Sequence, residues 1–291
     1  MTALVSRPVA GIFLGAIIIS FSSVMVALSH VDPLISAFYR VFFGCLFLFL
    51  PCGLNHEFKQ IQLKPCLVAS GCGLFFAVDL ISWHFCIGYV GPGLATILGN
   101  FQVFIMALAG ALLFKEKLGP AYILALPLAI FGLYMIIGLD MAQLTPRYLT
   151  GVGLGIVTAL SYSVFLLLMR FIHAGSDVPI FLYQVIMTGC CALIIGAIAV
   201  FMGRSFVIPD LTSLASLAGL GILSQGFAWV IISHYLPHVA TSRAGLILLL
   251  QPALSFVWDV VFFDRPTGMM GWIGVSIVLA AIYMGMTTRK T

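Results

Sequence analysis

Asp79 is a single carboxylate in the middle of an apolar run, and Trp83 follows it one helical turn later. Gln225 and Trp229 repeat this spacing 146 residues further along the chain. Residues four apart share one face of a helix, so each pair would point the same way. A buried carboxylate attracts an amine or carries a proton, and an indole face holds an apolar or cationic group. The pattern predicts a binding site for a small molecule.

Each of these residues also has a structural interpretation. The two tryptophans can be interfacial anchors that face lipid, and Asp79 can be the partner of a buried hydroxyl or amide. His84 lies about 140° around the helix from Asp79, so both cannot face one cavity squarely. We interpret His84 as a helix–helix hydrogen bonder or, because imidazole titrates near neutral pH, as a proton relay beside Asp79.

Further polar residues fall at similar depth in other apolar runs. Asn100 and Gln102 are two positions apart, about 200° around a helix, so only one of them is expected to face a cavity. Hydrogen bonding between helices explains such residues as well as substrate binding does. The remaining candidates for the same cavity are Ser23, Tyr162 and Gln251.

Two more charges lie inside apolar runs, toward the outer side of the membrane. These are Arg40 and Asp259. Burying an unpaired charge in the bilayer is costly, so we expect them to form an ion pair or, alternatively, an outer gate or anion contact.

The composition of the whole chain indicates a membrane protein. Of 291 residues, 62% are apolar and only 8% are charged, whereas about a quarter of the residues in a soluble domain are charged. A soluble fold, a disordered chain, a disulfide scaffold and a nucleic-acid binder are therefore excluded. The seven cysteines form no CxxC pair and predict reduced, buried thiols. We expect no metal and no cofactor.

Ten apolar segments have the length of about 20 residues that a membrane helix needs. They are Pro8–Ser29, Pro33–Cys52, Cys66–Tyr89, Gly93–Phe114, Pro120–Leu139, Gly151–Phe171, Pro179–Met202, Ser213–Leu236, Thr241–Phe263 and Thr267–Met286. With the N-terminus inside, nine Lys and Arg residues lie inside and three outside. This bias predicts a multi-pass protein of the inner or plasma membrane with both termini in the cytoplasm.

The chain also contains a weak internal repeat. Gly11, Leu14 and Gly15 recur as residues 151, 154 and 155, and later matches keep their order at slightly larger offsets. Residues 1–140 and 141–291 are therefore expected to be two five-helix copies within one membrane unit. An odd number of helices inverts the second copy relative to the first, which is the arrangement that lets a central site open to either side.

Several motifs carry a resemblance to a known family. Pro33 with Tyr39-Arg40, Phe114 to Leu118, Gln251-Pro252 and Phe263 to Pro266 resemble the ten-helix drug/metabolite transporter superfamily, EamA type. The resemblance covers nearly the whole chain and implies an all-α transporter of amino acids, other metabolites, nucleotide sugars or drugs. Lys115-Glu116 and Phe263-Asp264 stand where family members usually carry Gly-Glu. We expect Glu116 and Asp264 to cap the helices that follow them.

The sequence as a whole predicts a secondary transporter of small metabolites that works by alternating access. A single acid at membrane depth favours an exporter of amino acids or related amine-bearing compounds, with Asp79 as a proton carrier. Multidrug or organic-cation efflux is the alternative within transport. A membrane enzyme or a scaffold subunit is the rival class, but HExxH, GxGD, GxSG and Walker motifs are absent, so we expect no enzyme.

Two segments, Pro120–Leu139 and Thr267–Met286, carry almost no polar groups and are expected to face lipid or a second subunit. Gly268, Gly271 and Gly274 would allow a close helix contact, so a homodimer through helix five or ten is possible.

Overall fold

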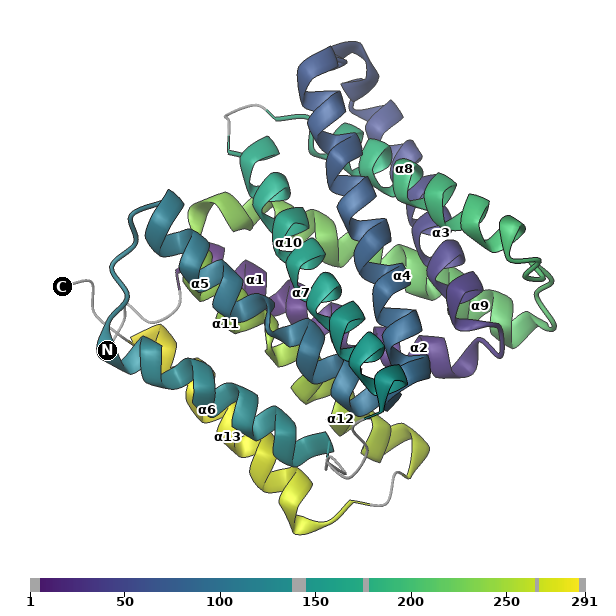
Figure 1. Cartoon of the computed structure of the whole chain (residues 1–291). Helices are drawn as coiled ribbons and strands as arrows, with labels where there is room; N and C mark the ends of the chain where they lie inside the picture. Colours follow the sequence, from purple (N-terminus) through teal and green to yellow (C-terminus); the bar gives the residue numbers. More distant parts are fainter. Residues whose placement is uncertain (1–5, 138–144, 175–177, 265–266, 288–291) are drawn as a thin grey trace.

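The computed structural model describes residues 6–137, 145–174, 178–264 and 267–287, and this part of the chain contains helices and no strands. Figure 1 shows long helices crossing one another in a single bundle. In chain order they are α1 (Arg7–Ser20), α2 (Ser22–Leu28), α3 (Pro33–Leu54), η1 (Glu57–Gln60), α4 (Leu63–Asn100), α5 (Gln102–Leu113), α6 (Pro120–Ile137), α7 (Pro146–Ile172), α8 (Ile180–Phe201), α9 (Leu211–Leu220), η2 (Gly221–Ala228), α10 (Trp229–Tyr235), η3 (Leu236–His238), α11 (Thr241–Leu248), α12 (Leu250–Phe263) and α13 (Met269–Thr287).

These helices make the membrane spans that the sequence predicts. In the described residues nine helical stretches are long and apolar enough to cross a bilayer, and Pro120–Ile136 is a shorter tenth. Large apolar side chains lie fully on the outside, as a bilayer requires: Leu112 is 68% exposed and Leu193 76%. The fold class, an all-α integral membrane protein, is confirmed.

Helix α4 supplies two spans because it folds back on itself. A Cβ on Gly99 would lie 3.9 Å from Cδ1 of Trp83, whereas 16 residues of straight helix would separate the two by about 24 Å. Both legs pack on α7: Cys86 donates to the carbonyl of Gly151, and a Cβ on Gly155 would lie 2.5 Å from Cβ of Leu98. Figure 1 shows the two legs on either side of the turn.

The fourth and ninth membrane spans, Ala95–Leu113 and Thr241–Phe263, are each broken at corresponding positions. Between α4 and α5 the N–H of Phe101 bonds to the carbonyl of Leu98, and between α11 and α12 the N–H of Leu249 bonds to that of Leu246. Phe101 has φ −59 and ψ −12, and Leu249 has φ −64 and ψ −12. Leu98 and Leu246, like Phe101 and Leu249, are 148 residues apart, the offset between Glu116 and Asp264. The matching breaks support the internal repeat.

The contacts between helices have a two-fold pattern. Helix α3 packs on α8, α5 on α11 and α6 on α13, so that three spans meet their counterparts from the other half of the chain. Helix α1 packs on α10 and α12, and its counterpart α7 packs on α4 and α5. Two five-helix copies related by a two-fold axis would make these pairs.

The two nearly apolar helices, α6 and α13, pack against each other. The glycines of α13 were expected to allow a contact with a second subunit, and this expectation is corrected. A Cβ on Gly274 would lie 2.6 Å from the carbonyl oxygen of Gly132, and Gly271 faces Phe256. These small residues therefore allow a close contact within the chain. The homodimer stays a prediction, without Gly271 and Gly274 as its interface.

Glu116 caps a helix, but not the one that follows it. Its carboxylate accepts hydrogen bonds from the backbone N–H groups of Thr241 and Ser242 at the start of α11, at 2.6 and 3.0 Å, and from the Ser242 hydroxyl at 2.6 Å. The acid thus stabilises the N-terminus of a helix in the other half of the chain. Asp264 ends α12 in a left-handed conformation, with φ 48.

Candidate functional site

An aromatic cluster lies where α4, α7 and α10 meet. The ring of Trp229 packs edge-on against Phe165, Phe76 and Tyr162, with centroid distances of 4.9, 5.9 and 6.3 Å. Phe76 and Phe165 stack on each other at 4.6 Å. Trp229 is 1% exposed, so it is a core residue rather than an interfacial anchor.

Arg40 on α3 reaches the edge of this cluster and is held there by Gln225. Its Nε donates to Oε1 of Gln225 at 3.2 Å, and its guanidinium carbon lies 6.0 Å from the centroid of Phe76. A Cβ on Gly44 would lie 2.4 Å from Cβ of Gln225, so glycine is what allows α3 and η2 to approach this closely. The expected pair between Arg40 and Asp259 is wrong, because α12 packs on α1 and α2 rather than on α3.

Gln225 belongs to a π-helical segment, η2, which interrupts the helix between α9 and α10. Such segments widen a helix by one residue per turn and occur frequently at functional sites. Here the widened turn presents Gln225 to Arg40 one turn before Trp229. Gln225 and Trp229 were expected to share one face of a regular helix, but Gln225 lies in the π-helical segment and Trp229 directly follows it.

Asp79 on α4 completes the group. It is 8% exposed and follows Phe76 of the aromatic cluster by three residues, which places both on one face of α4. This face lies near Arg40 and Tyr162. In the described part of the chain Asp79 and Arg40 nevertheless form no ion pair within 4.0 Å. The side chain of Gln251 lies close to the hydroxyl of Tyr162. The structure thus gathers Arg40, Asp79, Tyr162, Gln225, Trp229 and Gln251, which we call the central cluster.

The other predicted site residues bond elsewhere. Asn100 and His84 bond to carbonyls of their own helix, and Ser23 to that of Ser20. Trp83 is half-buried beside the turn of α4. Gln102 donates to the carbonyl of Gly245 at 3.2 Å and joins α5 to α11.

Sequence reasoning missed the role of several residues. Arg40 was expected toward the outer side, as the ion-pair partner of Asp259 or as an outer gate or anion contact, but its guanidinium bonds to Gln225 in the central cluster. Phe76 and Phe165 carried no signal, because nothing in a chain with 24 phenylalanines distinguishes them. Ser22, next to the predicted Ser23, is the residue that contacts η2, where its hydroxyl lies 2.7 Å from that of Ser224.

Polar contacts close the bundle beyond the central cluster at both ends. At the end that holds Glu116, Arg170 donates to the carbonyls of Leu236 and Val239, and its guanidinium lies 4.7 Å from the ring centroid of Phe114. We call this the Glu116 end.

The opposite end, which we call the Asp32 end, is joined by two contacts. Arg204 pairs with Asp32 at 3.2 Å, and the hydroxyl of Tyr39 donates to the carbonyl of Phe206. Both contacts join the two halves of the chain. The central cluster is therefore enclosed in this conformation.

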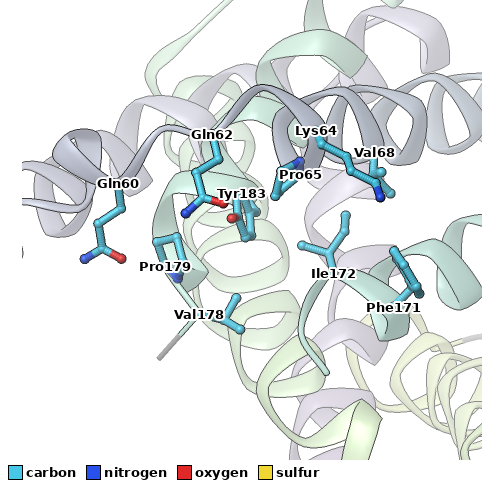
Figure 2. Close-up of a pocket in the computed structure, with 10 residues that line it drawn as sticks. All are labelled: Gln60, Gln62, Lys64, Pro65, Val68, Phe171, Ile172, Val178, Pro179 and Tyr183. Carbon is cyan, nitrogen blue, oxygen red and sulfur yellow. The ribbon is translucent and has the colours of Figure 1, made fainter. Parts of the chain in front are cut away.

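A separate cavity of about 330 Å³ opens at the Glu116 end, between the start of α4, the end of α7 and the start of α8. Figure 2 shows its lining, which combines polar Gln60, Gln62 and Lys64 with apolar Ile172 and Phe171. This cavity contains none of the predicted site residues.

The start of α8, beside this cavity, is stabilised by Glu57. The carboxylate of Glu57 accepts from the N–H of Leu182 at 2.8 Å. Burial raises the pKa of Glu57, and the backbone hydrogen bonds partly oppose that shift. The contact again joins the two halves of the chain.

The family and the curated proteins that this chain matches are named as transporters or efflux pumps. Residues 7–138 match the EamA-like transporter family. An uncharacterized transporter of Archaeoglobus fulgidus is 24% identical over 273 residues, which cover 94% of this chain and 94% of that protein. A probable amino-acid metabolite efflux pump of Escherichia coli K12 is 24% identical over 287 residues, covering 94% and 92%.

A second probable amino-acid metabolite efflux pump, from Salmonella typhimurium, is 22% identical over 290 residues, covering 94% of this chain and 93% of that protein. A solved crystal structure with 18% identity has a TM-score of 0.80 and covers 96% of this chain and 97% of its own. At that identity the likeness shows the fold alone. The helical bundle is thus one that a solved structure shares over nearly its full length.

Proposed function

The chain belongs to the EamA-type transporters of the drug/metabolite transporter superfamily, and from this we propose that it is a secondary transporter that exports amino acids or related amine-bearing metabolites. The observation that carries the proposal is Asp79, a carboxylate buried against an aromatic cluster at the crossing of α3, α4, α7 and α10. Such a carboxylate attracts an ammonium group and an aromatic face holds the apolar part of the same molecule.

The proposed mechanism is alternating access between two five-helix halves, residues 1–140 and 141–291. The contacts at the Glu116 end and at the Asp32 end would open in turn. The contacts of Glu116 with α11, of Arg170 with Phe114 and of Asp32 with Arg204 each join one half of the chain to the other. The breaks at Phe101 and Leu249 give the fourth and ninth membrane spans corresponding points at which to bend. Broken helices beside a central site are a recurring feature of secondary transporters.

The proposed location is the inner or plasma membrane, with both termini and the Glu116 end in the cytoplasm. The excess of Lys and Arg at that end supports this orientation. Asp79 is the proposed carrier of a coupling proton, because it is an acid buried at the centre of the bundle. The names of the relatives favour a transporter over an enzyme.

The test is metabolite profiling of cells and medium from strains that carry an empty vector, the wild type, Asp79→Asn or Asp79→Glu. We expect an amine-bearing compound to move to the medium with the wild type, at least tenfold less with Asp79→Asn, and in part with Asp79→Glu, which keeps the charge. Membrane levels of each variant are measured by immunoblot.

The possible results separate the parts of the proposal. Export that is equal in wild type and Asp79→Asn would remove Asp79 from the mechanism. Export of permanent cations without amino acids would favour organic-cation efflux, which the aromatic cluster would also suit. No difference between wild type and empty vector, at normal membrane levels, would contradict the transporter proposal itself.

A further inference from the structure

Three buried side-chain donors around the central cluster have no hydrogen-bond partner among the described residues. They are Nε2 of Gln225, Nε1 of Trp229 and Nε2 of Gln251. Gln225 is fully buried and Trp229 is 1% exposed. A buried N–H without a partner loses its hydrogen bonds to water and gains none in return, so native proteins leave few of them. Three in one cluster point to a group that is bound there during function.

The orientation of Gln225 follows from chemistry. A guanidinium only donates hydrogen bonds, so the amide oxygen of Gln225 must face Nε of Arg40. The amide nitrogen is therefore left as a free donor. Trp229 has only a donor to offer. The missing partner must accept several hydrogen bonds.

These donors belong to side chains in contact with one another. Gln225 bonds to Arg40, and Trp229 packs on Tyr162, which contacts Gln251. Together with the positive charge of Arg40, these N–H groups form one side of the site, which we call the carboxylate pole and which suits an anion. A carboxylate fits best, because its two oxygens accept up to four hydrogen bonds and pair with a guanidinium.

Asp79 is the opposite pole of the same cluster. Its charge acts on Arg40, yet the two residues form no ion pair within 4.0 Å. The guanidinium of Arg40 and the carboxyl group of Asp79 are therefore each left without a direct partner of opposite charge. A ligand that carries both an ammonium and a carboxylate would supply both partners at once and keep the cluster neutral.

We propose that the site recognises α-amino acids as zwitterions, with Arg40, Gln225 and Trp229 on the carboxylate and Asp79 on the ammonium. This inference rests on the proposed function and narrows it. It requires the carboxylate of the substrate, which an amine or an organic cation lacks. The aromatic faces of Phe76 and Phe165 remain for the side chain of the amino acid.

The test uses purified full-length protein in liposomes loaded with the twenty amino acids or with their carboxamides, which keep the amine and lack the carboxylate. Efflux is followed by mass spectrometry, with empty liposomes as the baseline. We expect at least one amino acid to leave at least tenfold faster than its carboxamide. In Gln225→Glu the new carboxylate would pair with Arg40 and repel that of the substrate, so we expect this ratio to fall to about one.

Two further variants keep the test informative. Gln60→Glu makes the same change on exposed η1, and we expect it to keep the wild-type ratio. Trp229→Phe removes the indole N–H and shortens the ring system but keeps an aromatic side chain, so it tests the carboxylate pole if Gln225→Glu does not fold. We expect it to raise the KM for the amino acid at least threefold and to leave that for the carboxamide unchanged.

The outcomes separate this inference from the proposed function. Carboxamides that move as fast as amino acids would overturn zwitterion recognition and leave an amine transporter in place. Efflux of neither set above baseline would overturn both. An unchanged ratio in folded Gln225→Glu, or equal KM effects of Trp229→Phe on both compounds, would remove these residues from the carboxylate pole and overturn the assignment.

Discussion

Replacing Glu116 with Ala should lower the thermal stability of the protein. The carboxylate of Glu116 accepts hydrogen bonds from two backbone N–H groups and one hydroxyl at the start of α11. Hydrogen bonds to a charged acceptor contribute about 1.5–3 kcal/mol each, and losing a helix cap costs about 0.5–2 kcal/mol. Water at the end of the bundle can replace part of this, so we expect a loss of about 2–3 kcal/mol.

That loss converts into a measurable shift. In chains of 150–250 residues, 1 kcal/mol changes Tm by about 2–4 °C, so Glu116→Ala should lower Tm by about 4–12 °C. The assay is thermal unfolding of purified protein in one detergent, followed by intrinsic tryptophan fluorescence. Gly110→Ala is a second perturbation of the same contact, because its Cβ would lie 2.5 Å from Oε2 of Glu116. It should shift Tm in the same direction.

The control is Asp264→Asn. Asp264 has φ 48, and asparagine adopts the left-handed conformation readily, so Tm should stay within about 1 °C. A Tm for Glu116→Ala that matches the wild type would refute the reasoning. It would mean that the cap of α11 contributes nothing to the stability of the bundle.

Two more substitutions test the packing and the titration of buried groups. Gly274→Ala would place a Cβ 2.6 Å from the backbone oxygen of Gly132, so α6 and α13 must separate at a cost of about 1–3 kcal/mol; Tm in detergent should fall, whereas Gly268→Ala, with nothing within 4 Å, should leave it unchanged. Burial lowers the pKa of His173, just beyond the end of α7, from 6.5 to about 4. Its neutral form therefore stabilises the fold above pH 6.5, and that stability should be lost as the pH falls from 6.5 toward 4. His173→Gln should reduce the fall in Tm over this range, and equal pH profiles would contradict the assignment.

Much of the fold follows from local sequence. Runs of about twenty apolar residues need no distant partner to become membrane helices, because the bilayer itself drives their formation. The ten segments were therefore predictable, including the short one that starts at Pro120. The turn inside α4 was also predictable, because the sequence divides there into Cys66–Tyr89 and Gly93–Phe114.

The break at Leu249 has a signal in the sequence, because Pro252 frees a backbone carbonyl one turn earlier. The break at Phe101 and the π segment were not predictable. Phe101 looks like any other apolar helical residue, and nothing in Gly221–Ala228 marks a widened turn. These features depend on how closely neighbouring helices pack, as Gly44 does against Gln225. Such contacts form only after the helices have assembled.

The candidate site divides in the same way. Asp79, Tyr162, Gln225, Trp229 and Gln251 were recognisable because polar groups and tryptophans at membrane depth are unusual in an apolar run. Which of them share one centre was open. Trp83 has the same spacing from Asp79 as Trp229 has from Gln225, yet it lies beside the turn of α4.

The sequence by itself determined that this chain spans a membrane, how often it does so and which polar residues lie at depth, because each depends only on neighbours in the chain. Only the tertiary structure decided that Arg40 pairs with Gln225, 185 residues away, and lies near Asp79 without an ion pair within 4.0 Å. It also decided that Glu116 caps α11 rather than α6. The physical reason is that polar groups in a membrane must find partners within the protein, and the crossing of distant helices selects those partners.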